Sequence, residues 1–294
     1  MTTCPVAAAA PLTPLLTGPR TSASVLAVFS AAAVLGVAPA GGTGPRIVSL
    51  LSQQASGVPN GVRLPVSAAE LPFAGLHPGR SATVGGREIV LGEAVYRLAR
   101  TWHTAVPAIR PCNSALETLA CRLAKVQLGV PTDRVSLLAV GVVDAEPGAA
   151  VRRLIGLGSG LTPGGDDLLA GLLVGLRASG KAVLLQLVRH SIGSDWEATA
   201  ERTTSFSVDL LRLAAAGQAS TEVLGLLTAI HRTLPCVGHG PLHAAIDKLL
   251  GVGHTSGADL ATGLLMGLRP IRRGRPVGGL ARLPALGTIG GVAQ

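Results

Sequence analysis

Two apolar segments of the sequence carry glycines four residues apart, and this spacing constrains the fold more than any other feature. The first segment reads GLGSGLTPGGDDLLAGLLVGLR from Gly156, and the second reads GVGHTSGADLATGLLMGLR from Gly251. Each pattern predicts a glycine-rich loop that leads into an apolar helix. A helix that is apolar on all sides has to be buried, so we expect both at the centre of a helical domain.

The glycines inside these two helices cost stability unless something offsets the loss. Four such glycines are present: Gly171, Gly175, Gly263 and Gly267. Together they cost about 2–4 kcal/mol relative to alanine, and close packing of the two helices is the simplest compensation. Most residues from Asp167 to Arg177 recur from Asp259 to Arg269. We interpret the two segments as an internal duplication and expect them to pack against each other through their glycine faces.

The first half of the chain has short apolar runs separated by Gly, Pro, Asn and Ser, which is typical of strands. The sequence therefore predicts an α+β protein with a small, N-terminal β-rich domain at 23–110. A mostly α-helical domain at 111–269 follows, containing the duplicated glycine-rich loop-helix unit. A helix is also expected at 93–101. We expect 1–22 to be a disordered extension and 270–294 to be a basic, flexible tail.

Residues 20–40 allow two interpretations. Their apolar stretch and the following Ala38-Pro39-Ala40 triplet resemble a secretory signal. The same letters fit a pair of buried strands, Val25–Phe29 and Ala33–Val37, and we favour the strands because only one basic residue precedes the stretch. The four cysteines show no CxxC pair, so we interpret them as reduced thiols and expect a cytoplasmic protein.

Composition favours a small acidic partner over nucleic acid or a membrane. The chain has 25 Lys and Arg against 16 Asp and Glu, a net charge of +9, and only 2% aromatic residues. Proteins that bind single strands need aromatic rings on which bases stack. The apolar runs are also too short to predict a membrane span.

The two glycine-rich loops are the best candidates for an anion site. Helix N-termini that carry glycines and hydroxyl groups bind carboxylates and phosphates. We expect the ligand to lie between the loops, although simple helix capping explains the same residue types. The candidate substrate-binding residues are Gly158, Ser159, Gly160, Thr162, Gly164, Gly165, Arg202, Thr203, Thr255, Ser256 and Gly257.

The acidic residues of the loops divide into two groups. Asp167 and Asp259 occupy matching positions, so we interpret both as structural caps. Asp166 is matched by Ala258, which makes it the better candidate for a catalytic proton acceptor or, alternatively, a Mg²⁺ ligand. His254 lies in the second loop and is the other catalytic candidate, because an imidazole at a helix N-terminus can polarise a carbonyl.

Apart from Mg²⁺ at Asp166, no metal or cofactor is expected. One set of residues has helical spacing suited to zinc, namely Cys236, His239, His243 and Asp247. A glycine–proline pair interrupts this run, so a helix start is the favoured interpretation. No P-loop, dinucleotide-binding or GxSxG motif is present.

The segments GLGSGLTPGGDDLLAGLL and GVGHTSGADLATGLLMGL resemble the signature pair of the AllH family. The intervening RTTSFSVDLLRLAAAG is also similar to a segment of that family, although Ser159 and Gly164 replace its usual Pro and Ser. Members are linked to the oxamate carbamoyltransferase of allantoin degradation, as one subunit acting with two others. The resemblance implies carbamoyl transfer between a small anionic amide such as oxamate and carbamoyl phosphate. The alternative is a non-catalytic, anion-binding or scaffolding subunit.

Overall fold

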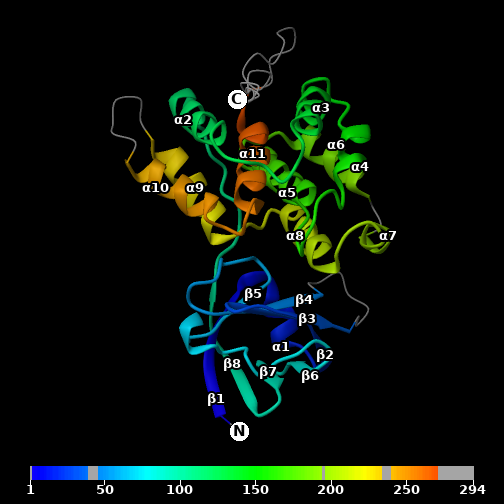
Figure 1. The fold of residues 1–294 in the computed structure, drawn as a ribbon, viewed down its shortest axis with the longest axis vertical. Coiled ribbons are helices and arrows are strands. Elements are labelled where there is room, and N and C mark those ends of the chain that lie inside the picture. The colour runs from blue at the N-terminus through cyan, green and yellow to red at the C-terminus, as the bar shows by residue number, and fades with distance from the viewer. Residues whose placement is uncertain (1, 39–45, 194–195, 234–239, 271–294) are drawn as a thin grey trace, which may run out of the picture.

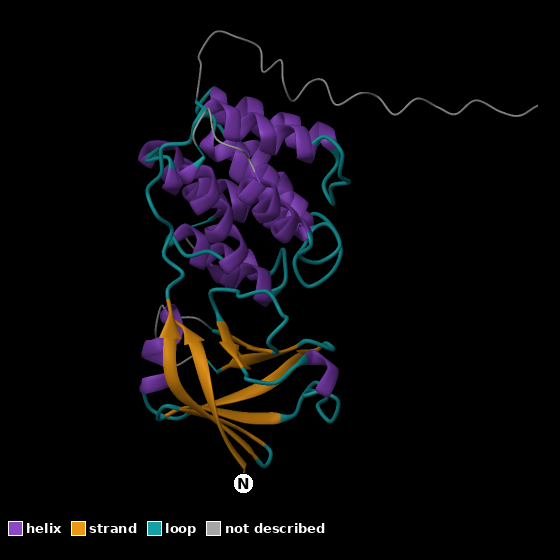
Figure 2. Cartoon of the chain, turned by 90° about the vertical axis from the view of Figure 1, so that its left-hand side faces the viewer, coloured by secondary structure: helices purple, strands orange, loops and turns teal. Residues whose placement is uncertain are grey.

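The protein consists of a barrel lobe and a helical lobe, with the N-terminus at the far end of the barrel (Figures 1 and 2). All of the strands lie in the first lobe, and the helices α2 to α11 form the second. The computed structural model describes residues 2–38, 46–193, 196–233 and 240–270.

The barrel lobe is a closed sheet in the order β1-β5-β4-β3-β2-β6-β7-β8. β1 closes it by pairing parallel with β8 and antiparallel with β5. Apolar side chains from the strands and from α1 (Thr13–Thr17) fill the interior. The strands are β1 (Thr2–Ala9), β2 (Thr21–Val28), β3 (Ala32–Val37), β4 (Ile47–Leu51), β5 (Gly61–Arg63), β6 (Ser81–Gly85), β7 (Glu88–Leu91) and β8 (Ala94–Trp102).

The expected fold, a small β-rich domain followed by a domain of duplicated loop-helix units, is wrong as a description of this architecture. The β part is a closed eight-stranded barrel, and it begins at Thr2. The expected disordered extension instead supplies β1 and α1. Leu16 of α1 and the preceding Leu12 are buried in the barrel core. The expected helix at 93–101 is β8, because the backbone of this segment pairs with both β1 and β7.

The interpretation of residues 20–40 as a strand pair is confirmed. β2 and β3 are antiparallel neighbours, and Val25 pairs with Leu35. Both side chains are buried in the barrel interior. The expected basic tail from 271 onward lies outside the described residues.

The helical lobe surrounds two central helices, α5 and α11 (Figure 1). Its helices lie within 111–269, where the helical domain was expected. The helices are α2 (Asn113–Leu123), α3 (Thr132–Val143), α4 (Gly148–Leu154), α5 (Gly164–Ala178), α6 (Ala182–Ile192), α7 (Trp196–Ala200), α8 (Ser205–Ala215), α9 (Thr221–Arg232), α10 (Gly240–Leu250) and α11 (Ser256–Leu268).

The central helices α5 and α11 touch backbone to backbone through their glycines. A Cβ atom on Gly171 would overlap the carbonyl oxygen of Leu260, and one on Gly263 would overlap that of Leu168. The second glycines of the two helices also lie directly against each other. The predicted packing of these two helices through their glycine faces is therefore confirmed.

The two lobes are joined by buried polar contacts. The carboxylate of Asp209 on α8 accepts the backbone N–H of Arg46 at 3.1 Å and the amide of Asn60 at 2.9 Å. Burial raises the pKa of Asp209. A second contact joins the loop before β5 to α9, where the Ser56 hydroxyl donates to Glu222 at 2.6 Å.

The expected lack of a membrane span and the expected reduced cysteines both concern where the protein is located. Within the described ranges, no helix combines the length and apolar character needed to cross a membrane. Cys4, Cys112 and Cys121 are free thiols, and Cys236 lies outside the described residues.

Candidate functional site

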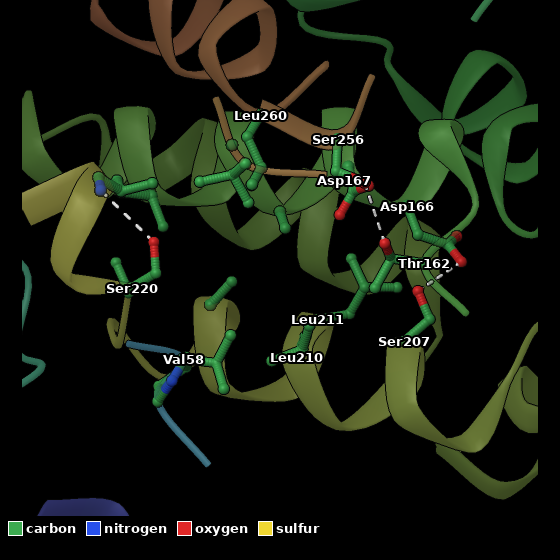
Figure 3. A pocket seen from close by; sticks show the side chains of 18 of the residues that line it. Val58, Thr162, Asp166, Asp167, Ser207, Leu210, Leu211, Ser220, Ser256 and Leu260 are labelled. Atoms are coloured by element: carbon green, nitrogen blue, oxygen red, sulfur yellow. Dashed lines mark hydrogen bonds between the residues drawn. The ribbon is translucent and has the colours of Figure 1, made fainter. Parts of the chain in front are cut away.

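A pocket of about 230 Å³ lies where the helical lobe meets the barrel (Figure 3). Helices α5, α8, α9 and α11 form its walls, and the barrel loop at 56–59 closes one side. Most of the lining is apolar, including Val174, Leu210, Leu211, Ala214, Val223 and Leu260.

One end of the pocket is polar and is built by both loop-helix segments. Thr162 precedes α5 and Ser256 begins α11, and their hydroxyl oxygens lie 3.2 Å apart. Asp167 lies beside them, while Asp166 and Ser207 are adjacent along the same wall (Figure 3). The close contact of α5 with α11 thus brings together residues that are far apart in the sequence.

Asp167 is a buried residue of the pocket whose hydrogen bonding is incomplete. Its side chain is 5% exposed, and its Oδ2 atom has no hydrogen-bond partner. The pKa of Asp167 is raised to about 8. Burial is the main cause, the Ser256 and Thr162 hydroxyls oppose it, and the nearby Asp259 and Asp166 carboxyls add a smaller increase. Asp167 is therefore mainly protonated at pH 7.

Asp166, the predicted catalytic residue, is held by three donors from the protein. Its Oδ1 atom accepts the N–H of Gly156 at 2.9 Å. Its Oδ2 atom accepts the hydroxyls of Ser207, at 2.7 Å, and Thr203. These contacts fasten the loop before α5 and the start of α8 to α5. Because both oxygens already accept protein donors, a Mg²⁺ ion at either one would compete with them.

Asp259 does not line the pocket. Both of its oxygens lie 3.1 Å from the N–H of Gly129, in the segment after α2. Burial raises its pKa to about 6, and the N–H of Gly129, the Thr255 hydroxyl and the N–H of Val130 oppose this shift. Asp259 thus anchors a distant segment, whereas a cap of its own loop was expected.

The first turns of α5 and α11 offer fewer free amides than an anion site needs. The N–H groups of Gly165 and Gly257 already donate to carbonyl oxygens within their own loops. A Cβ on Gly165 would overlap the carbonyl oxygen of Leu154, and one on Gly257 would overlap that of Leu249. Close packing therefore explains these two glycines, and Gly164 is likewise buried against Gly129.

The remaining candidate residues lie outside the pocket. Gly158, Ser159 and Gly160 form an exposed turn in which both glycines have positive φ, 119° and 92°. The exposed Arg202 donates to the Arg152 carbonyl oxygen near this turn.

Two candidate site residues of the second loop, His254 and Thr255, also lie outside the pocket. His254 is exposed and does not line the pocket, and Thr255 faces Gly129. The structure therefore divides the predicted residues into an exposed turn, a pocket end and a set of packing contacts.

The helices that form the site carry the decisive sequence similarity. Residues 154–268 match the AllH family, described as oxamate carbamoyltransferase subunit AllH. The AllH match begins at the last residue of α4 and ends at the last residue of α11, so it contains every helix of the pocket. It covers less than half of the 294-residue chain and leaves the barrel unmatched. No solved structure matches the chain.

Several residues of the site were not expected from the sequence. Ser207 was missed as a partner of Asp166, and the barrel residues Ser56, Val58 and Pro59 were missed as one wall of the pocket. Hydroxyl residues recur between Thr203 and Ser207, but only the tertiary structure determines which side chains they face. In the part of the chain that is described, no group of three His, Cys, Asp or Glu side chains is placed to hold a metal. Cys236 and His239 lie outside that part.

Proposed function

We propose that this chain is a subunit of a carbamoyltransferase that acts on a small amide such as oxamate, with carbamoyl phosphate as the second substrate. The proposal rests on the AllH match, because residues 154–268 contain all of the helices that line the pocket. The name of the family describes a subunit, so we propose that partner subunits complete the enzyme. We further propose that it acts in the cytoplasm, which agrees with its free thiols.

The charges in the pocket argue against phosphate binding there. Asp166 and Asp167 line the pocket, and none of its described lining residues is Lys, Arg or His. A phosphate bound in this pocket would be buried without a positive side chain to pair with it. We therefore propose that the anionic substrates bind at the exposed turn Gly158–Gly160, with Arg202 close by and a partner subunit covering it.

A non-catalytic subunit is the second candidate function. It is favoured because Asp166 accepts three hydrogen bonds from the protein and because His254 is exposed outside the pocket. In this alternative, the chain binds an anion or supports a catalytic partner.

The two candidates differ in what the purified chain does alone. Phosphate release from carbamoyl phosphate and oxamate should be measured first with this chain and then with its candidate partner subunits. Activity only in the assembly, reduced by Arg202→Gln and unchanged by the exposed control Arg189→Gln, is the expected result. Phosphate release by the chain alone would exclude the non-catalytic role, and an inactive assembly would contradict the transferase proposal.

A further inference from the structure

Three buried carboxyl groups, two that line the polar end of the pocket and one outside it, have no cationic partner. Asp166, Asp167 and Asp259 are each at most 5% exposed. Their hydrogen-bond donors are backbone N–H groups and hydroxyls, all neutral. None of the ion pairs among the described residues includes any of the three. Buried carboxylates normally have a positive partner, so this cluster has room for one more positive charge.

Three oxygen atoms at the end of the pocket are placed to bind a positively charged group. The unpartnered Oδ2 of Asp167, the Thr162 hydroxyl and the Ser256 hydroxyl lie together at the end of the pocket. A primary ammonium group has three N–H donors and no acceptor. Three neighbouring oxygens, one of them on a carboxylate, therefore match its hydrogen-bonding capacity.

The rest of the pocket determines the body of the ligand. Beyond the polar end the walls are apolar side chains from α5, α8, α9 and α11. A dry cavity of about 150 Å³ accommodates benzene, so the 230 Å³ of this pocket accommodates a body of comparable or larger size. A carboxylate or phosphate head group would instead meet Asp167 with no positive side chain beside it.

A bare metal ion fits the same end poorly. Hard cations such as Ca²⁺ need six or more oxygen ligands and Mg²⁺ needs six. Asp166 is occupied by protein donors, and Asp259 faces Gly129. An organic ammonium needs only three acceptors and also fills the apolar space.

We infer that this pocket binds a small aliphatic primary amine in its protonated form, with the ammonium group on Asp167, Thr162 and Ser256 and the carbon chain against α8 and α9. The inference is independent of the proposed carbamoyl transfer, because it concerns binding by this chain alone. The other titratable groups around Asp167 are Asp166, which lines the pocket, and Asp259, which does not.

Calorimetric titration of the full chain with three probes of equal length tests the head group. The probes are butylammonium, butyramide and butyrate at pH 8. We expect butylammonium to bind, butyramide to bind at least 10-fold more weakly and butyrate not to bind. Methylammonium should bind more weakly than butylammonium, since it leaves the apolar walls uncovered. Tighter binding of butyrate or butyramide, or no binding of butylammonium at millimolar concentration, would overturn the inference.

Asp167→Asn tests the residue. This variant keeps the shape of the side chain but should weaken butylammonium binding at least 10-fold. Asp259→Asn is the matched control, because it removes an equally buried carboxyl outside the pocket and should change the affinity by no more than a few fold. Titrations of the wild type at pH 7 in buffers of different ionisation enthalpy should show release of close to one proton, because the ammonium displaces the proton of Asp167. Equal affinity of wild type and Asp167→Asn would contradict the inference even if both bind.

None of these titrations contains carbamoyl phosphate or a partner subunit. A failure to bind butylammonium would therefore leave the proposed transferase role standing. Equally, an inactive assembly would leave the amine site untouched.

Discussion

At Asp167, burial opposes ionisation more strongly than the neighbouring hydroxyls favour it. The pKa is raised to about 8, from an ordinary value of 3.8. The folded state therefore binds one more proton than the unfolded state between about pH 4 and pH 8. The contribution of this group to stability is fully present below pH 4 and is lost as the pH rises through 8, where an ionised carboxylate is buried.

This sign leads to a prediction for Asp167→Asn. The variant should be more stable than the wild type at pH 8–9, by an amount on the order of a few kcal/mol, and close to it at pH 5. Thermal unfolding between pH 5 and pH 9 measures the difference. For Asp259→Asn, the gain in stability over the wild type should develop at lower pH, because the pKa of Asp259 is raised only to about 6. A pH-independent difference between wild type and Asp167→Asn would show that the group is not protonated in the fold.

Substitution of Asp166 should destabilise the protein, in contrast to substitution of Asp167. Its carboxylate accepts donors from Gly156, Ser207 and Thr203, so Asp166→Asn replaces an acceptor with a donor where donors already point. We expect a loss of about 1–3 kcal/mol in the free energy of unfolding. Urea denaturation is the measurement, and Ser207→Ala should cost less because it removes only one of the three donors. A variant as stable as the wild type would return Asp166 to the list of catalytic candidates.

The role of Asp166 could not be predicted from the sequence. Asp166 was preferred for chemistry because the other segment has Ala258 at the matching position. The asymmetry is real, but its cause is structural: only the first segment has α8 packed against it, with Ser207 and Thr203 as donors. Which carboxylate meets a donor depends on residues about 40 positions away in the chain. No local pattern encodes that.

At the scale of elements, the glycines of α5 and α11 were predictable because they carry a cost. An apolar helix with two interior glycines is unstable unless another backbone comes close, and the structure provides that contact. The barrel was not predictable in the same way. β1 pairs with β8 across most of the lobe's sequence, and a short Ala- and Pro-containing strand has no periodicity that reveals such a partner.

Because α5 and α11 are in backbone contact, a glycine-to-alanine substitution in α5 should affect stability very differently from one in α9. Gly171→Ala should destabilise the protein by about 1–3 kcal/mol or more, since the new Cβ would overlap the backbone of Leu260. Gly225 in α9 is the matched control, because nothing lies within 4 Å of a Cβ placed there. Gly225→Ala should stabilise the protein by about 0.5–1 kcal/mol. Similar effects of the two substitutions on the unfolding midpoint would refute the backbone contact between α5 and α11.

At the scale of the whole molecule, the pocket belongs to both lobes. The barrel loop at 56–59 forms one wall, and the hydrogen bonds from Asn60 and Arg46 to Asp209 hold the lobes together beside it. The AllH match contains the helical walls only. The sequence segment shared with the family is therefore insufficient, by itself, to enclose the pocket.

The junction can be tested at Asn60. Asn60→Ala removes a donor from the buried carboxylate of Asp209, and we expect it to lower the free energy of unfolding by about 1–3 kcal/mol. The control is Gln54→Ala, which removes an exposed hydrogen bond to Ser67 and should change stability by less than about 0.5 kcal/mol. Equal effects in urea denaturation would indicate that the polar contact does not hold the lobes together.

The glycine contact has a mechanical consequence. Side chains between two helices normally separate their backbones, but α5 and α11 touch backbone to backbone. The two helices should therefore move as one unit. Asp167 and Ser256 lie at one end of this unit, and at the other end the Lys181 ammonium holds the carbonyl oxygens of Gly267 and Arg269. A molecule that displaces α5 in the pocket should therefore displace α11 with it.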